Sequence, residues 1–274
     1  MGTLYVSDLD GTLLRRNQQT SAYTNRVINQ LVKQGLCFSY ATARSYSTAR
    51  LVTKGMVAAF PLIVYNGAFI RDNASGELLH TSAFEPCDAE RIVRELDAGG
   101  VAPIVYEMID GTERFSYLPD AINRQTAEFI ALRQGDGRDR KVSTLEELLV
   151  GEVFYFTCIG EPQQLEPFFR RYRTTFHCVY QRDIYSGEQW LEIMPKTTSK
   201  AHAARRLKEL LGCERVVAFG DGPNDIELFD VADESYAVAN AVPELKCRAT
   251  AVIGSNEDDG VAKWLAEHAN PKGN

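Results

Sequence analysis

Near its N-terminus this chain of 274 residues reads Leu4-Tyr5-Val6-Ser7-Asp8-Leu9-Asp10-Gly11-Thr12. Residues 4–7 read as a buried strand, yet the run ends at two carboxylates one residue apart, with a glycine directly after them. An ionised carboxylate in apolar surroundings costs many kcal/mol unless a positive group meets it. We therefore expect Asp8 and Asp10 to bind something at the end of this strand.

Strand and helix patterns alternate after this first strand and again near the C-terminus. Residues 21–34, for example, carry apolar side chains at helical spacing and are followed by Gly35, which is typical of the position after a helix. Strands that alternate with helices predict βαβ units and a parallel sheet. The predicted elements are strands at 4–7, 36–40, 61–65, 215–219, 237–239 and 251–253 and helices at 21–34, 48–54, 201–211, 223–229 and 261–268.

The middle of the chain has a different pattern. Asp110-Gly111 and Ser186-Gly187 each separate two strand-like runs, which is a hairpin signal. We expect an α+β domain at 84–193, inserted into an α/β domain formed by 1–83 and 194–274. The elements predicted in the insertion are strands at 104–108, 113–117, 153–159, 176–185 and 189–194, helices near 88–96 and 162–172, and a charged loop at 135–141.

The composition excludes several kinds of partner. The net charge of −7 argues against a nucleic-acid partner, whose phosphates need a basic surface. No apolar run approaches the ~20 residues that span a bilayer, and no secretory signal is recognisable. The cysteines and histidines are scattered, so neither a disulfide framework nor a zinc site is expected. We expect a cytoplasmic protein without membrane contact, and a monomer by default.

Polar motifs fall at predicted strand ends or helix starts of the outer domain, and ligands gather at the carboxyl ends of parallel strands. Taken singly, each motif has an ordinary structural explanation, since Asp is common at turns, Thr42 suits a helix N-cap, and Lys200 suits a solvated helix face. The motifs are Asp8-Leu9-Asp10-Gly11-Thr12, Ala41-Thr42-Ala43-Arg44, Lys200, and Gly220-Asp221-Gly222-Pro223-Asn224-Asp225.

In combination these groups complement one another. The topology predicts that the carboxylates of Asp8, Asp10 and Asp221 converge, and they would repel one another unless a hard cation lay between them, for which Mg²⁺ is suited. Lys200 and Thr42 would add a positive charge and a hydroxyl donor. Together with helix N-terminal N–H groups, such a set forms a phosphate pocket. The sequence therefore predicts phosphoryl chemistry.

The chain resembles a haloacid dehalogenase (HAD) superfamily phosphatase of the Cof-like, type IIB-capped kind, over essentially its whole length. Asp-x-Asp-Gly-Thr after an N-terminal strand, followed some 210 residues later by Gly-Asp-Gly-x-Asn-Asp, carries this resemblance. It implies a Rossmann-like core, with a parallel sheet and helices on both faces, and an inserted α+β cap of type C2B. The cap at 84–193 would then determine substrate specificity.

The resemblance also implies roles for individual residues. Asp8 would be the nucleophile that forms an aspartyl-phosphate, and Asp10 the general acid and then the general base. Mg²⁺ would be held by the carboxylates of Asp8 and Asp221 and by the backbone carbonyl of Asp10. The phosphoryl oxygens would be bound by Thr42, Lys200, Asn224 and the amides near Leu9 and Ala43, with Asp225 orienting Lys200 or a metal-bound water.

This chain departs from the family pattern at Ala43, where many relatives have glycine. If the backbone there has a positive φ, Ala43 carries a small strain. Arg44 is expected to pair either with substrate or with a core carboxylate. Candidate substrate contacts, each of which could instead belong only to a sheet face, are Asn66, Tyr106, Glu107, Tyr180, Arg182 and Tyr185.

The expected activity is Mg²⁺-dependent hydrolysis of small phosphorylated metabolites. Sugar phosphates are the first expectation, and cofactor phosphates such as pyridoxal phosphate or flavin mononucleotide the second. The alternatives are a phosphomutase of the same fold, a receiver-like module and a non-catalytic phospho-ligand binder. A dehalogenase is disfavoured, because attack on carbon does not require an acid–base group at Asp10.

Overall fold

A computed structural model describes residues 2–183, 185–269 and 271 of this chain. The chain divides into two compact units: residues up to Thr81 together with those from Thr198 onward, and Ser82–Thr197. The second unit is therefore a continuous insertion in the first. Its limits differ by two and four residues from the predicted limits at 84 and 193.

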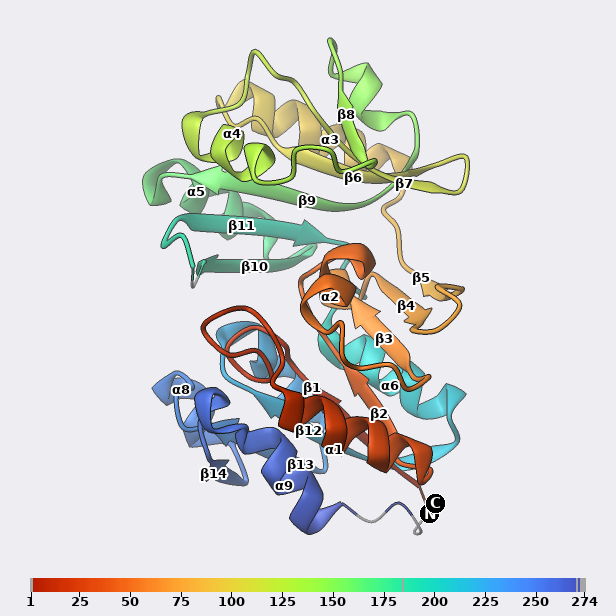
Figure 1. Cartoon of the computed structure of the whole chain (residues 1–274). Helices are drawn as coiled ribbons and strands as arrows, with labels where there is room; N and C mark the ends of the chain where they lie inside the picture. The colour runs from red at the N-terminus through yellow and green to blue at the C-terminus, as the bar shows by residue number, and fades with distance from the viewer. Residues whose placement is uncertain (1, 184, 270, 272–274) are drawn as a thin grey trace. The chain divides into compact units, whose positions relative to one another are not determined.

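The first unit contains a parallel sheet with the strand order β14-β13-β12-β1-β2 (Figure 1). Its inner strand β1 (Gly2–Ser7) pairs with β12 (Cys213–Gly220) on one side and β2 (Cys37–Tyr40) on the other. Leu4 and Val6 are fully buried, as expected for a strand covered on both faces. This rigid strand carries Asp8 at its C-terminal end.

Helices cover both faces of this sheet, which confirms the predicted Rossmann-like core. Helices α1 (Ala22–Lys33) and α9 (Gly260–His268) pack side by side in front of the sheet in Figure 1. Helix α6 (Lys200–Leu210) lies on the opposite face, where it contacts β12 and α7 (Ile226–Val231). The remaining elements of the sheet are β13 (Glu234–Val238), α8 (Pro243–Arg248) and β14 (Ala251–Ile253).

The expectation that residues 61–65 continue the parallel sheet holds only in part. Strand β3 (Pro61–Val64) pairs antiparallel with β4 (Phe69–Asp72), and β4 pairs with β5 (Leu78–Thr81). An isolated parallel bridge joins Ala41 to Ile63. The turn that follows β3 accounts for the antiparallel pairing with β4, because Tyr65, Asn66 and Gly67 all have positive φ and reverse the chain at once. A parallel crossover would need a dozen or more residues.

The helix expected at 48–54 begins earlier, as α2 (Tyr46–Val52). Its N-cap is Ser45, whose hydroxyl accepts a hydrogen bond from the backbone N–H of Thr48. Serine is a favoured N-cap because it satisfies an N–H that has no partner inside the helix. The cap therefore sets the start of this helix.

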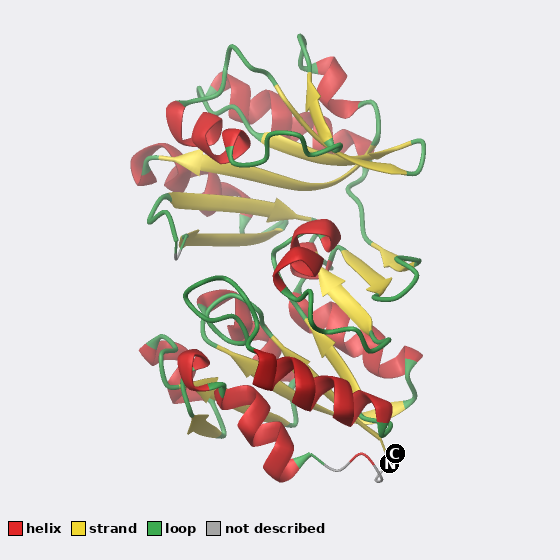
Figure 2. Ribbon diagram, in the orientation of Figure 1, coloured by secondary structure: helices red, strands yellow, loops and turns green. Residues whose placement is uncertain are grey.

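The second unit is an α+β fold built on a sheet with the order β10-β11-β9-β6-β7-β8 (Figure 2). The neighbouring strands from β10 to β7 pair antiparallel, as predicted, and β7 pairs parallel with β8. Its elements are α3 (Pro86–Ala98), β6 (Ile104–Ile109), β7 (Thr112–Tyr117), α4 (Arg124–Ala131), β8 (Asp139–Lys141), β9 (Glu152–Gly160), α5 (Pro162–Tyr172), β10 (His177–Arg182) and β11 (Gln189–Met194).

An apolar core joins this sheet to α3 and α5. Ile92 and Val93 of α3 and Leu165 of α5 are buried in it against sheet residues such as Phe156 and Leu191. On α4, the ring of Phe129 makes an edge contact with Trp190 of β11. The loop expected at 135–141 contains the short edge strand β8, whose charged sequence has no alternating apolar pattern to reveal it.

Candidate active site

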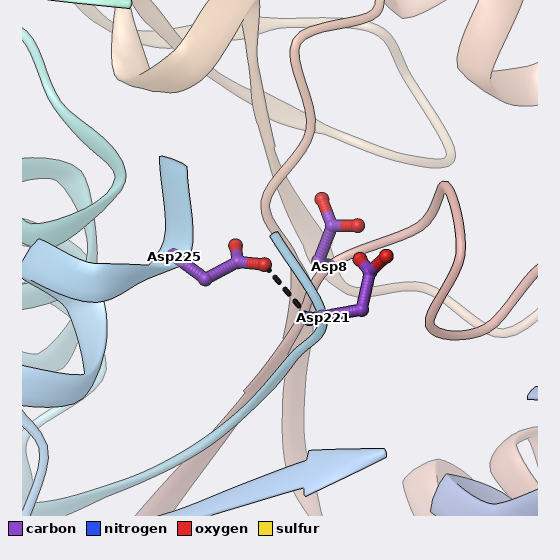
Figure 3. A group of neighbouring side chains, drawn as sticks. All are labelled: Asp8, Asp221 and Asp225. Atoms are coloured by element: carbon purple, nitrogen blue, oxygen red, sulfur yellow. Dashed lines mark hydrogen bonds between the residues drawn. The ribbon is translucent and has the colours of Figure 1, made fainter. Parts of the chain in front are cut away.

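The two acidic motifs meet because they end adjacent parallel strands. Ser7 of β1 lies beside Phe219 of β12, and the backbone N–H of Asp8 donates to the carbonyl of Phe219 at 2.9 Å. Asp8 and Asp221 therefore leave the sheet at the same edge. Figure 3 shows these two side chains next to each other, with Asp225 on the neighbouring turn.

Among the described residues, Asp8, Asp221 and Asp225 form a cluster with one carboxylate oxygen of each within 4.8 Å of the others. Asp8 and Asp225 are buried, and Asp221 is partly buried. Burial, together with the charges of Asp225 and Asp10, raises the pKa of Asp221 to about 7. Burial also raises the pKa of Asp8 well above its usual range, although Lys200 opposes this effect. Like charges that are buried together favour binding of a cation.

Lys200 lies at the start of α6, where Ser199 caps the helix. Its Nζ donates to Asp8 Oδ1 at 2.5 Å and to Asp225 Oδ1 at 2.7 Å, and the lysine side chain is 1% exposed. Burial alone would lower the pKa of Lys200, but Asp225 and Asp8 outweigh it and the pKa is raised. Lys200 is therefore a fixed positive charge beside Asp8.

The carboxylate of Asp225 is occupied by hydrogen bonds within the protein. Besides the bond from Lys200 to Oδ1, its Oδ2 accepts the backbone N–H groups of Asp221 and Gly222 at 3.0 and 3.1 Å. Figure 3 draws the bond to Asp221 as a dashed line. Asp225 thus holds both the 220–225 turn and Lys200, which leaves Asp8 and Asp221 as the better metal ligands of the cluster.

The chemistry of these donors fits a hard divalent cation. The cluster has three carboxylates against one ammonium group, and hard cations prefer oxygen ligands. Asp221 is held in place because its Oδ1 accepts a hydrogen bond from Thr12 at 3.0 Å. Gly11, with φ +82°, approaches so closely that a Cβ on it would lie 2.2 Å from Asp221 Oδ2. The absence of a side chain at Gly11 therefore leaves room for the Asp221 carboxylate.

The side chain of Asp10 is not part of this cluster, so the expected convergence of Asp8, Asp10 and Asp221 holds for Asp8 and Asp221 only. The charge of Asp10 nevertheless raises the pKa of both. Side chains two positions apart on a turning chain point in different directions. The carboxylate of Asp10 accepts hydrogen bonds from Arg44 instead. Arg44 Nε donates to Oδ2 at 2.7 Å and Nη2 to Oδ1 at 2.6 Å. Of the two partners expected for Arg44, the structure shows a carboxylate. The backbone carbonyl of Asp10 as a metal ligand remains a prediction.

The predicted phosphate-binding residues come from four segments of the first unit: the turn after β1 (Leu9), the loop after β2 (Thr42 and Ala43), the start of α6 (Lys200) and the turn after β12 (Asn224). Thr42 is fully buried, and its hydroxyl accepts the backbone N–H of Arg44 at 3.1 Å. Ala43 is not among the described residues with positive φ, so the strain considered for it is absent. Asn66 donates its backbone N–H to the Thr42 carbonyl at 2.8 Å, and its Oδ1 accepts from Asn224 Nδ2 at 3.4 Å.

Leu9 and two residues not assigned from the sequence support the turn after Asp8. The Leu9 carbonyl accepts the N–H groups of residues 12, 13 and 14. Thr12 is the last residue of the Asp-x-Asp-Gly-Thr motif, so its place in the motif was a signal from which a role in the site could have been predicted. Asn240 Nδ2 donates to the Gly11 carbonyl at 2.7 Å. No signal in the sequence marks Asn240, because it lies in an ordinary turn after β13.

Several candidate contacts in the second unit serve its own packing. Glu107 is fully buried and accepts hydrogen bonds from Ser116 at 2.6 Å, Arg140 at 3.1 Å and the Gly151 N–H at 2.8 Å. Tyr106 is buried, and the Tyr180 hydroxyl donates to the Pro162 carbonyl. Arg182 and Tyr185 are exposed.

Residues 5–265 match the sequence profile of the haloacid dehalogenase-like hydrolases, and the chain belongs to this family. It is 28% identical over 281 residues to the 5-amino-6-(5-phospho-D-ribitylamino)uracil phosphatase YitU of Bacillus subtilis, covering 97% of both chains. The match confirms the predicted family and the prediction that the chain is an enzyme.

Two solved structures have the same fold. One is TM0651 from Thermotoga maritima, at 25% identity and a TM-score of 0.78, with 98% of both chains covered. The other is the HAD subclass IIB sugar phosphatase BT4131, at 19% identity and a TM-score of 0.76, covering 97% of this chain and 98% of that one. The predicted fold class is confirmed. Among residues 2–183, 185–269 and 271, no helix is long and apolar enough to cross a membrane.

Proposed function

We propose that this protein is a Mg²⁺-dependent phosphatase that hydrolyses small phosphorylated metabolites through an aspartyl-phosphate. The observation that carries the proposal is the position of Asp8, at the buried end of β1 and hydrogen-bonded to Lys200 beside Asp221. A nucleophilic carboxylate, a fixed cation and a metal-binding carboxylate are the groups that phosphoryl transfer requires.

In the first step, an oxygen of Asp8 attacks phosphorus and forms the acyl-phosphate bond while the bond to the leaving oxygen breaks. The electron pair of that bond goes to the leaving oxygen, which takes a proton from Asp10. Lys200, Thr42, Asn224 and the amides near Leu9 and Ala43 would bind the phosphoryl oxygens. Such preorganised donors stabilise charge that develops in the transition state.

In the second step, water attacks the phosphorus of the aspartyl-phosphate and gives a proton to Asp10. The Asp8 carboxylate is released together with inorganic phosphate, so both aspartates return to their starting states. Lys200, already bonded to Asp8 Oδ1, balances the carboxylate when it reappears. Asp225 orients Lys200 throughout the cycle.

Mg²⁺ would be held by the carboxylates of Asp8 and Asp221 and by the backbone carbonyl of Asp10. When bound, it supplies positive charge that offsets the phosphoryl oxygens and the carboxylates. The local geometry supports this role for Asp221, because Thr12 and Gly11 hold its carboxylate in one place. We assign catalysis to the domain of 1–83 and 194–274 and substrate specificity to the cap at 84–193.

Sugar phosphates are the first substrates to test. The Bacillus subtilis relative is named for a substrate with a phosphorylated ribityl chain, which is a sugar-alcohol phosphate. The same chemistry would suit a small polyol or sugar phosphate here. Pyridoxal phosphate and flavin mononucleotide complete the panel as cofactor phosphates.

The test is phosphate release from p-nitrophenyl phosphate and from this panel, with Mg²⁺ and with a chelator. We expect Mg²⁺-dependent activity that Asp8→Asn abolishes, and a radiolabelled phosphoenzyme in the parent protein that the variant lacks. Full activity of Asp8→Asn would refute the proposal. Hydrolysis in ¹⁸O-labelled water should place label in the released phosphate, whereas a phosphomutase would return the group to the substrate without label.

A further inference from the structure

We propose that Arg44 is the positioning residue for Asp10, and that its planar guanidinium group fixes the carboxylate for proton transfer. This inference rests on the proposed function, because it assigns a task to the acid–base residue of that mechanism. Both nitrogens used by Arg44 face Asp10, with distances of 2.7 and 2.6 Å to the two carboxylate oxygens. A bidentate pair of this kind fixes the plane of the carboxylate as well as its distance.

The backbone of Arg44 is anchored on the phosphate-binding side. Its N–H donates to the Thr42 hydroxyl at 3.1 Å, and its carbonyl accepts the N–H of Tyr65 at 3.0 Å. The side chain therefore extends from the loop proposed to bind the phosphoryl group to the residue proposed to protonate the leaving group. A shift of this loop would therefore move Arg44 and, through it, the carboxylate of Asp10.

A hydrogen bond to another segment of the chain also holds the guanidinium group of Arg44 in place. Arg44 Nη2 also donates to Gln18 Oε1 at 3.2 Å. Gln18 has a φ of +57°, an uncommon conformation for this residue type. Three segments of the first unit thus meet at Arg44: the turn after β1, the loop after β2 and the turn that carries Gln18.

The Arg44–Asp10 pair is only partly buried, so a substrate oxygen or a water molecule can approach Asp10. The side chains of Arg44 and Asp10 are 19% and 24% exposed.

A comparison of substrates with different leaving groups distinguishes this positioning role from simple substrate binding. p-Nitrophenolate is stable without protonation, whereas the alkoxide of a sugar is not, so only the sugar phosphate needs the acid. The experiment measures Arg44→Ala and Arg44→Lys on p-nitrophenyl phosphate and on the fastest sugar phosphate of the panel. Both variants are checked for folding by chemical denaturation.

For Arg44→Ala we expect kcat on the sugar phosphate to fall about 100-fold, within the range of general acid–base effects. With p-nitrophenyl phosphate, the first turnover should still give a burst of p-nitrophenolate. Phosphoenzyme should then accumulate, because Asp10 also serves as the base in the second step. Added guanidinium ion should restore part of the lost activity. Arg44→Lys should remain impaired, because an ammonium group cannot bind both carboxylate oxygens in one plane.

The matched control is Arg215→Ala, which removes another arginine–carboxylate pair, with Glu234 at 2.5 Å, near the start of β12. This variant should keep the parent kcat on both substrates. A rise in KM alone, an equal loss on both substrates without a burst, or unchanged kinetics of Arg44→Ala would overturn the inference. Activity of Asp8→Asn would instead overturn the proposed function, so the two failures are distinguishable.

Discussion

Lys200 Nζ donates to Asp8 Oδ1 at 2.5 Å, and the side chains of the two residues are only 1% and 6% exposed. Such a buried pair is held by mutual attraction, because each charge alone would lose its hydration without compensation. Asp225 accepts a second hydrogen bond from the same ammonium group at 2.7 Å. One lysine therefore serves both the proposed nucleophile and the turn beside it.

Replacing Lys200 should affect both stability and activity. Lys200→Met leaves Asp8 and Asp225 buried without their cation, and removal of one partner of a buried pair costs about 3–5 kcal/mol. We expect a loss of this size at pH 8 in chelator, measured by urea denaturation, together with loss of phosphatase activity. Lys208→Met on the same helix is the control, since Lys208 contacts only the exposed carbonyl of Glu214 among the bonds described. Equal losses in the two variants would contradict this assignment.

Gly11→Ala should damage the metal site more than the fold. The new Cβ would lie 2.2 Å from Asp221 Oδ2, so the carboxylate must move. Gly111→Ala is a matched control, because Gly111 has a similar φ of +74° but open space around its Cβ position. Both variants should lose about 1 kcal/mol of stability from the positive φ. Activity and Mg²⁺ affinity, measured by titration calorimetry, should fall at least about tenfold only for Gly11→Ala.

The stability of the metal-free protein should fall as the pH rises. Asp221 has a pKa of about 7 in the folded protein, against an ordinary value of 3.8. Between about pH 4 and pH 7, Asp221 is ionised in the unfolded chain but still protonated in the folded protein. Raising the pH over this range therefore lowers the free energy of the unfolded state relative to the folded state. The loss should be on the order of a few kcal/mol. Denaturation in chelator at pH 4 and pH 8 measures it.

Asp221→Asn provides the comparison for this pH effect. The variant should be more stable than the parent protein at pH 8 in chelator, and nearly equal to it at pH 4, where Asp221 is protonated. Mg²⁺ should stabilise the parent protein at pH 8, because it binds the folded state, and should have little effect on the variant. If the free energies of unfolding of the parent protein and the variant differ by the same amount at both pH values, Asp221 is not the source of the pH dependence.

Glu107 should matter for the stability of the second unit. Glu107→Ala removes the acceptor of the buried Ser116 hydroxyl and of the Gly151 N–H, and unsatisfied buried groups cost about 1–3 kcal/mol each. We expect a loss of about 2–4 kcal/mol on denaturation. Glu152→Ala, at an exposed position of the neighbouring strand, should stay within about 0.5 kcal/mol of the parent protein. An equal effect of the two substitutions would exclude a special role for Glu107.

The sequence predicted the sheet and its acidic edge because those depend on local patterns. Residues 4–7 and 215–219 are apolar strands, and the order of strands and helices implies that their ends meet. The orientation of single side chains is a different matter. Asp10 turns to Arg44, and Asp225 takes its place in the carboxylate cluster. Neither could be predicted, because both depend on how the turns fold rather than on residue type.

The course of β3 shows a second limit. Its apolar run is what a parallel strand requires, but the turn that follows it determines its antiparallel pairing with β4. That turn has three consecutive residues with positive φ, including Tyr65 and Asn66. Asn-Gly is a pair that often has positive φ, but a tyrosine seldom does, so a reversal that includes Tyr65 was not predicted. Surrounding contacts, such as the bond from the Asn66 N–H to Thr42, hold it in place.

The pairing of β1 with β12 has a consequence for how the protein is made. Leu4 and Val216 are neighbours in the sheet although more than 200 residues separate them. During translation, the strand that carries Asp8 leaves the ribosome long before its partner exists, and the inserted unit emerges complete in between. Long-range pairing of this kind slows folding and leaves apolar strands uncovered for a time. The nascent chain should therefore acquire its inserted unit first and its phosphatase activity last.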